Sequence, residues 1–230
     1  MPPFDTVIFD LDGTLLNTLE DLADSTNYAL AAHHMPQRTL DEVRRFVGNG
    51  VALLIHRAVP QGTPPETEEA VLSCFRAHYL GNMEHKTAPY AGIPALLSSL
   101  SEAGLSLAVV SNKFDGAVKG LCEKYFGPVL PVAVGESPGV AKKPAADMVH
   151  LALRALSRDG GRAVYVGDSD VDIATAQNAA LPCISVTWGF RDEEFLRAHG
   201  AQHIVHTPQQ LLEALLLPAR GEDASAPRRP

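Results

Sequence analysis

The chain has 230 residues, 46% of them hydrophobic and 20% charged, and its 19 Lys and Arg against 27 Asp and Glu give a formal net charge of −8. This composition is ordinary for a soluble protein, and the length suits one domain with a large insertion, or two small domains. An acidic balance without a dense run of Lys or Arg argues against nucleic-acid and membrane partners, but it leaves room for a local site that binds a small anion. No apolar run is long enough to span a membrane and the N-terminus lacks a signal-peptide pattern, so we expect a cytoplasmic protein.

Five short apolar runs predict buried strands, at residues 6–9, 105–110, 132–134, 163–166 and 183–186. Segments with helical periodicity lie between them, such as Ile93, Leu96, Leu97 and Leu100 at the i, i+3, i+4 and i+7 positions of one helix face. This alternation predicts an α/β fold, with a Rossmann-like parallel sheet sandwiched by helices. Reactive groups in such sheets gather at the carboxyl ends of the strands.

One stretch, residues 17–86, breaks the alternation because it contains several helical patterns and no convincing strand. A capping-box candidate at residues 39–42 (TLDE) marks one helix start, and a GNG turn at residues 48–50 separates two helices. We therefore predict an inserted α-helical cap domain at 17–86 that lies over the carboxyl edge of the sheet.

The insertion makes the expected core domain discontinuous, with residues 1–16 and 87–218 forming one α/β unit. Residues 219–230 have no hydrophobic periodicity and are expected to form a disordered tail.

Two carboxylates follow the first predicted strand, in residues 9–14 (FDLDGT). Asp10 and Asp12 are two residues apart, so in extended chain they share one face at roughly 7 Å and can flank a single small group. The alternative for these residues alone is a solvated, Asp-rich turn that Gly13 relaxes.

Polar side chains also end later strands. Ser111 and Asn112 are short hydrogen-bonding residues followed by the cation Lys113, a combination suited to phosphate oxygens. Lys143 precedes a proline that can start a helix, whereas Lys142 is expected to face solvent. In isolation, each of these segments also fits an ordinary polar turn or a surface lysine.

Asp168 and Asp172 follow the fourth predicted strand and are four residues apart, on one face of a helical turn. Two like charges at this spacing repel each other unless a cation lies near them, which favours a metal site. Acids in a first helical turn are also stabilised by the helix dipole without any metal. Because four successive strand ends carry complementary groups, one shared site is favoured over four unrelated turns.

These segments resemble the four motifs of the haloacid dehalogenase superfamily, and the resemblance extends over the chain up to the tail. The helical insertion between the first two motifs resembles the C1-capped branch, and the turn Gly48-Asn49-Gly50 is similar to that of bacterial phosphoglycolate phosphatases. One departure is Asn17-Thr18 at the expected cap hinge, where many relatives carry Asp and then Ser. The matching segments are Asp10-Leu11-Asp12-Gly13-Thr14, Ser111-Asn112, Lys143-Pro144 and Gly167-Asp168-Ser169-x-x-Asp172.

The resemblance implies a Mg²⁺-dependent phosphomonoester hydrolase that forms an aspartyl-phosphate intermediate. It implies that Asp10 is the nucleophile, and that Asp12 is first the acid and then the base. The implied Mg²⁺ ligands are Asp10, the backbone carbonyl of Asp12 and Asp168, with Asp172 in support. The implied phosphate-binding residues are Ser111, Asn112 and Lys143.

The implied substrate is 2-phosphoglycolate, cleaved to glycolate and phosphate, or a similar small phosphorylated metabolite. Its carboxylate is expected to meet the cap, at Gly48, Asn49 and Gly50 or at Arg44, Arg45 and Arg57, although arginines on such helices are more often solvated. A phosphomutase or pyrophosphatase of the same superfamily, and a non-catalytic sensor of a phosphorylated ligand, are the alternatives. An acid two residues after the nucleophile favours phosphoryl chemistry over halide displacement. The oligomeric state is left open.

Overall fold

A computed structural model describes residues 2–158 and 161–217 of the chain, and the expected tail at 219–230 lies outside the described residues. The strands are β1 (Thr6–Phe9), β2 (Leu16–Asn17), β3 (Ala88–Pro89), β4 (Ser106–Phe114), β5 (Val132–Glu136), β6 (Ala163–Gly167), β7 (Cys183–Val186) and β8 (His203–Val205). The helices are α1 (Leu19–Ala32), α2 (Leu40–Phe46), α3 (Val51–Ala58), α4 (Pro65–Asn82), α5 (Ile93–Glu102), α6 (Asp115–Phe126), α7 (Asp147–Ala155), α8 (Asp170–Asn178), α9 (Glu193–Ala198) and α10 (Pro208–Leu216), with a 3₁₀ turn at Gly127–Val129.

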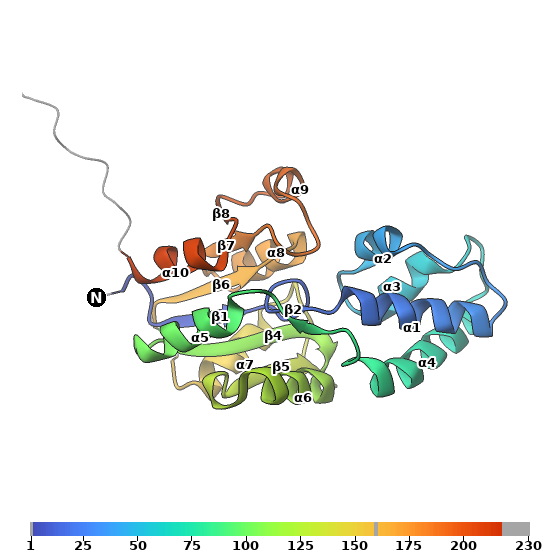
Figure 1. Ribbon diagram of the computed structural model, residues 1–230, viewed down its shortest axis with the longest axis horizontal. Coiled ribbons are helices and arrows are strands. Elements are labelled where there is room, and N and C mark those ends of the chain that lie inside the picture. Colours follow the sequence, from blue (N-terminus) through green and yellow to red (C-terminus); the bar gives the residue numbers. More distant parts are fainter. Residues whose placement is uncertain (1, 159–160, 218–230) are drawn as a thin grey trace, which may run out of the picture.

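Six strands form one sheet in the order β5-β4-β1-β6-β7-β8, and every neighbouring pair is parallel (Figure 1). β1 lies between β4 and β6, with Phe9 opposite Val109 on one side and Val166 on the other. The order of strands reverses at β1, and ligands of open α/β sheets bind at such a switch point. The predicted parallel α/β fold is confirmed.

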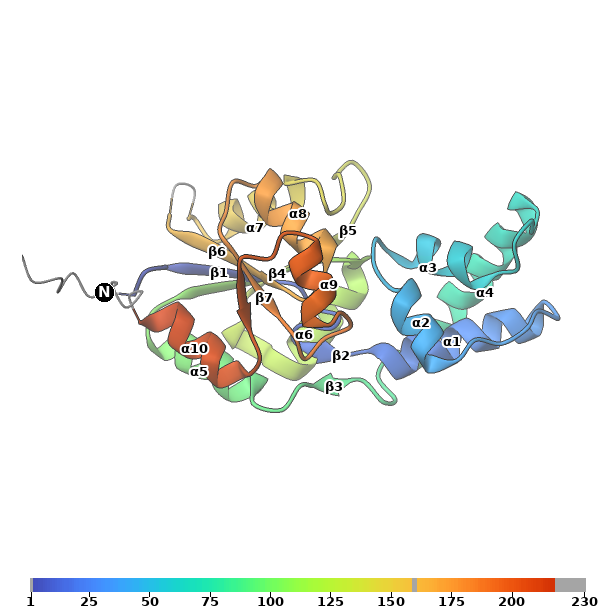
Figure 2. The ribbon, with the colours of Figure 1, turned by 90° about the horizontal axis from the view of Figure 1, so that it is seen from above.

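Helices cover both faces of the sheet, and the alternation of side chains along β1 shows why (Figure 2). Val7 and Phe9 pack with the apolar faces of α5, α6 and α10, whereas Ile8 points to the other face, against α7 and the Ala176 side chain of α8. β1 is thus buried on both sides, which explains the short continuous apolar run of residues 6–9 in the sequence.

The helices α1 to α4 pack on one another beyond the carboxyl ends of the strands (Figure 1). They surround their own apolar cluster, in which Phe75 and Tyr79 of α4 are fully buried. The expected capping box at the start of α2 is present, with Thr39 and Glu42 bonded to each other's backbone. The two connections to this helical part pair as the antiparallel strands β2 and β3.

Several elements differ from the sequence prediction, among them the short strands β2 and β3, which were not expected. β4 continues through the expected strand end to Phe114, and its pairing with β5 is irregular between Val110 and Phe114. Pro144 does not start a helix; it follows a cis peptide bond, and α7 begins at Asp147. β8 was not predicted, because three residues with one buried side chain carry too little periodicity.

No helix in the described parts of the chain is both long and apolar enough to cross a membrane.

Candidate active site

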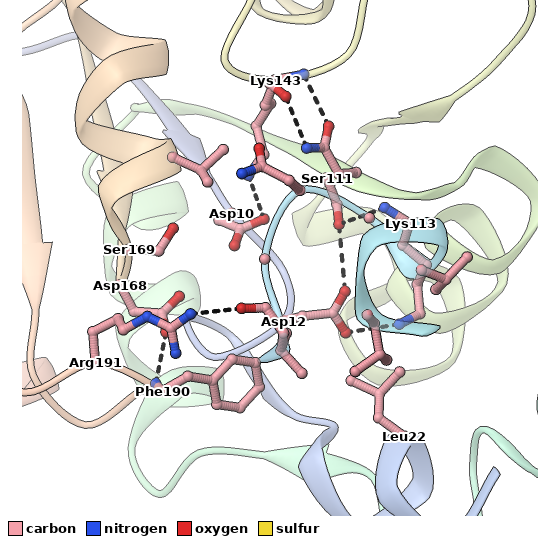
Figure 3. A pocket seen from close by; sticks show the side chains of 18 residues that line it. Asp10, Asp12, Leu22, Ser111, Lys113, Lys143, Asp168, Ser169, Phe190 and Arg191 are labelled. Carbon is pink, nitrogen blue, oxygen red and sulfur yellow. Dashed lines mark hydrogen bonds and ion pairs between the residues drawn. The ribbon is translucent and has the colours of Figure 1, made fainter. Parts of the chain in front are cut away.

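Asp10 and Asp12 open onto one pocket at the carboxyl end of β1, as the i and i+2 spacing predicts (Figure 3). The Asp10 amide donates to the Val166 carbonyl, which continues the pairing of the strand up to the acid, and Leu11 between the acids is fully buried. The pocket is also lined by residues of the other motifs and of the helical part, among them Ser111, Asn112, Lys113, Lys143, Asp168, Gly48, Asn49, Gly50, Phe190 and Arg191.

Lys143 joins three of the predicted site residues. Its Nζ atom lies 2.7 Å from Asp10 Oδ1 and 2.8 Å from Asp172 Oδ1, and it also donates to the Tyr165 hydroxyl at 3.1 Å. The Lys143 side chain is 3% exposed. A buried ammonium with two carboxylate partners is held in one position, so Lys143 is a fixed positive charge beside Asp10.

The pKa values in this cluster follow from burial and from neighbouring charges. Burial raises the pKa of Asp10 well above its usual range, and the nearby Asp172 and Asp168 carboxylates add to the rise against the opposing effect of Lys143. For Lys143, burial alone would lower the pKa, but the Asp10 and Asp172 carboxylates hold the pKa well above its usual value. The single positive charge of Lys143 does not balance the three buried carboxyl groups of Asp10, Asp168 and Asp172.

Asp168 occupies a tight cradle formed by two glycines. A Cβ atom on Gly13, which has a φ of +90°, or on Gly189 would clash with the Asp168 side chain. The Phe190 amide donates to Asp168 Oδ2 at 2.7 Å, and Thr14 Oγ1 lies 3.2 Å from Asp168 Oδ1. Burial and then the Asp172 carboxylate raise the pKa of Asp168 to about 7.

The acidic residues fit a hard divalent cation. Carboxylate oxygens of Asp10, Asp168 and Asp172 lie within 4.8 Å of one another and all three residues are buried. Mg²⁺ prefers oxygen ligands, and its charge would offset the burial and the repulsion between carboxylates that together raise the pKa values of Asp10 and Asp168. Asp172 Oδ2 already accepts from the Ser169 amide and hydroxyl, and its Oδ1 from Lys143, as a supporting acid would.

The Asp12 side chain turns to the other side of the pocket, toward β4. Lys113 Nζ donates to Asp12 Oδ1 at 2.7 Å, and the Ser111 hydroxyl lies 3.4 Å from Asp12 Oδ2. The Lys113 ammonium also lies 4.8 Å from the ring centroid of Tyr79, on α4 of the helical part. The sequence placed Lys113 among the phosphate-binding groups and gave no indication of this ion pair.

Asn112 fixes the backbone that carries Lys143. Its Oδ1 accepts from the Lys143 amide and its Nδ2 donates to the Lys143 carbonyl, both at 2.9 Å. Asn112 still lines the pocket, but this pairing positions Lys143, a contact that the spacing of the two motifs could not reveal.

The helical part closes the pocket with the turn at residues 48–50, between α2 and α3. The expected cap arginines do not line this pocket. Arg44 and Arg45 pair with Asp41, and Arg57 donates to the Phe46 carbonyl. These side chains surround a neighbouring groove, and the pocket instead receives Arg191 from the loop after β7, which the sequence gave no reason to select.

Comparison with known proteins agrees with this geometry. The model of the family described as haloacid dehalogenase-like hydrolase matches residues 7–186. A phosphoglycolate phosphatase from Caulobacter vibrioides is 34% identical over 206 residues, which cover 88% of this chain and 86% of that protein.

Two solved structures extend the similarity to three dimensions. A crystal structure from Lactobacillus delbrueckii subsp. bulgaricus, of a protein thought to be a phosphoglycolate phosphatase, superposes with a TM-score of 0.90 at 34% identity, covering 95% of this chain and 100% of that one. CbbY from Rhodobacter sphaeroides, in complex with phosphate, has a TM-score of 0.74 at 27% identity over 92% of this chain and 99% of its own. The resemblance and the enzyme class predicted from the motifs are confirmed.

Proposed function

Because the chain belongs to the haloacid dehalogenase-like hydrolase family and is a phosphatase of that family, we propose that it hydrolyses a small phosphomonoester through an aspartyl-phosphate on Asp10. The observation that carries this proposal is the shared pocket, onto which Asp10, Asp12 and the cation Lys143 open together. A nucleophile, an acid and a fixed positive charge are the groups that phosphoryl transfer to a carboxylate needs.

In the first half of the proposed reaction, an Asp10 carboxylate oxygen attacks phosphorus and the bond from phosphorus to the ester oxygen breaks. Protonated Asp12 gives its proton to the leaving oxygen, which departs as an alcohol. Lys143 stabilises the negative charge of the transferring group, with Ser111 and Asn112 as the proposed donors beside it.

In the second half, water attacks the phosphorus of the aspartyl-phosphate, and Asp12, now a carboxylate, takes a proton from that water. The bond between phosphorus and the Asp10 oxygen breaks, which releases inorganic phosphate and restores the Asp10 carboxylate. Asp12 is protonated again and ready for the next substrate.

We propose Mg²⁺ as the cofactor, with Asp10, the Asp12 backbone carbonyl and Asp168 as its protein ligands and Asp172 in support. The support for this assignment is the cluster of buried carboxylates around Asp10. When bound, Mg²⁺ supplies positive charge that reduces the repulsion between a carboxylate nucleophile and an anionic phosphate.

The proposed substrate is 2-phosphoglycolate, which would give glycolate and phosphate. Its support is the name shared by several relatives, including those from Caulobacter vibrioides and Agrobacterium fabrum. We further propose that residues 17–86 act as a cap domain over a core of residues 1–16 and 87–218, and that Gly48, Asn49 and Gly50 contribute to specificity. A small phosphorylated metabolite is the partner that we propose, and the cytoplasm is the compartment.

The test is phosphate release with and without Mg²⁺ from p-nitrophenyl phosphate, 2-phosphoglycolate, sugar phosphates, nucleotides and pyrophosphate. We expect Mg²⁺-dependent turnover with 2-phosphoglycolate preferred. No release from any ester would overturn the hydrolase and favour a phospho-ligand sensor. A clear preference for another ester would overturn only the substrate.

The nucleophile has its own test in Asp10→Asn. We expect turnover to be abolished, because an amide cannot form the acyl phosphate. Asp147→Asn is the matched control, since Asp147 is exposed on α7 and away from the pocket, and it should retain parental activity. Activity of Asp10→Asn close to that of the parent would exclude Asp10 as the nucleophile.

A further inference from the structure

Three cationic side chains line the pocket, and they differ in how their charges are compensated. Lys143 pairs with Asp10 and Asp172, and Lys113 pairs with Asp12. Within residues 2–158 and 161–217, Arg191 has no carboxylate at ion-pair distance. The guanidinium of Arg191 is therefore a positive charge without a negative partner at the wall of the pocket.

Arg191 is nevertheless held in a defined orientation. Its Nη1 donates to the Arg44 carbonyl at 2.8 Å and its Nη2 to the Val47 carbonyl at 2.6 Å, and the guanidinium carbon lies 5.3 Å from the Phe195 ring centroid. Neutral carbonyls fix the group without cancelling its charge. The Nε donor is buried and has no hydrogen-bond partner among the described residues. An unsatisfied buried donor costs free energy, and a ligand oxygen that accepted this hydrogen bond would remove the cost.

Arg191 lines the same pocket as Asp10, Asp168 and the turn at residues 48–50 (Figure 3). Arg191 directly follows Phe190, whose amide donates to Asp168, and a Cβ atom on Gly48 would lie 3.7 Å from the Arg191 Nη2 atom. A substrate with its phosphate at Asp10 and Lys143 would therefore have its far end near this side chain.

We propose that Arg191 binds the anionic group of the substrate that is not transferred, a carboxylate next to the phosphate ester. This inference rests on the proposed function and adds a residue that selects the substrate class. A guanidinium suits a carboxylate because the charges are opposite and its donors are planar. The core supplies this residue, whereas the carbonyls of α2 and its C-cap orient it, so substrate selection depends on the position of the helical part.

The test compares two phosphate esters of similar size, 2-phosphoglycolate and 2-hydroxyethyl phosphate, which lacks the carboxylate. For Arg191→Gln, we expect kcat/KM to fall by about 100-fold with 2-phosphoglycolate, mostly through KM, and by less than about threefold with 2-hydroxyethyl phosphate. Arg191→Lys keeps the charge but loses the planar donors, and it should fall between the parent and Arg191→Gln.

Arg57→Gln is the matched control. Arg57 also donates to a carbonyl at the end of α2, that of Phe46, but it lies outside the pocket, so its loss should affect both esters by the same small factor. A second readout is inhibition by 3-phosphonopropionate, which has a phosphonate and a carboxylate and cannot be hydrolysed. Its inhibition constant should rise about 100-fold in Arg191→Gln.

Equal losses for the two esters in Arg191→Gln would assign a purely structural role to Arg191 and overturn the inference, as would a parent enzyme that does not distinguish the esters. Those results leave the hydrolase intact because turnover is still observed. A parent enzyme inactive toward every phosphate ester would overturn both the inference and the function on which it rests.

Discussion

Lys113 is the side chain that holds Asp12, the proposed acid and base. The Lys113 side chain is 3% exposed, its ammonium lies 2.7 Å from the Asp12 carboxylate, and its other neighbour is the ring of Tyr79. Burial alone would lower the pKa of Lys113, but the Asp12 carboxylate raises this pKa above its usual value, so the lysine stays charged. Lys113 is therefore a positioning residue that keeps Asp12 in one orientation.

We expect Lys113→Met to lower kcat by about 10- to 100-fold with little change in KM, because a proton-transfer group that loses its orientation loses part of its effect. Single-turnover measurements of alcohol release should show a smaller loss with p-nitrophenyl phosphate than with an alkyl phosphate, since an aryl leaving group needs less protonation.

Lys119→Met is the control for the removal of a lysine, because Lys119 is exposed and pairs with Asp115 on the surface of α6. The control should retain parental rates. A Lys113→Met variant that loses activity through KM alone would show that Lys113 binds substrate instead of positioning Asp12.

The sequence predicted the acids and Lys143 as site residues, but not Tyr165 or Arg191. Asp10 and Asp12 are recognisable because their spacing is local and follows a strand. Tyr165 and Arg191 act through contacts with residues 22 and more than 140 positions away, respectively. Such contacts depend on how distant segments pack, which one sequence does not contain.

At the scale of elements, the turn between α2 and α3 combines three unusual backbone conformations. Gly48, Asn49 and Gly50 have φ values of +125°, +61° and +89°. Two of the three are glycines, for which such conformations carry no steric penalty, and Asn is among the residues that tolerate them best. This series of conformations lets the backbone of the helical part approach the site, and Lys142 Nζ lies 3.4 Å from the Asn49 carbonyl.

Gly50→Ala should raise KM for 2-phosphoglycolate, because a side chain at positive φ costs roughly 1–2 kcal/mol and the turn would relax away from the pocket. Gly62→Ala is the matched control. Gly62 also has a positive φ, of +84°, in a loop of the helical part, but nothing lies within 4 Å of its added Cβ. Both variants should lower the melting temperature, and only Gly50→Ala should change KM. Equal KM values for the two variants would show that this turn does not contribute to substrate binding.

Elements with a clear hydrophobic period were predictable and those set by pairing were not. β1 and β7 have the predicted ends, and Val71, Leu72, Phe75 and Tyr79, which form one of the helical patterns in residues 17–86, are the buried stripe of α4. β2 and β3 have two residues each and exist because they pair with each other, so neither has a pattern of its own. The extension of β4 past Val110 likewise depends on its irregular pairing with β5.

At the scale of the whole molecule, the buried acids connect the stability of the protein to pH and to metal. The pKa of Asp168 is about 7 in the folded protein, against an ordinary value of 3.8. Between pH 3.8 and about pH 7, the Asp168 carboxyl therefore keeps its proton in the folded protein, whereas in the unfolded chain it has released it. The stability associated with this proton is fully present below about pH 4 and is lost as the pH rises through about 7.

Without metal, lowering the pH from about 8 to about 5.5 should therefore raise the melting temperature of the parent more than that of Asp168→Asn. The parent gains a proton on Asp168 in the folded state, whereas the amide of the variant has no proton to bind. Mg²⁺ needs ionised carboxylates, so it should stabilise the parent more at the higher pH, and it should stabilise Asp168→Asn little at either. Thermal melts with Mg²⁺ or with a chelator measure both effects. Equal Mg²⁺ stabilisation of the two proteins would exclude Asp168 as a ligand.

The pairing of β2 with β3 has a consequence for how the molecule can be rebuilt. Leu16 lies opposite Pro89 and Asn17 opposite Ala88, so the chain leaves the α/β part and returns to it at a single point. A short hairpin turn between Asn17 and Ala88 would excise the helices without stretching the remaining backbone. The same joint would accept a different set of helices, so the fold has a built-in site for exchanging the helical wall of the pocket while leaving the acids of the sheet unchanged.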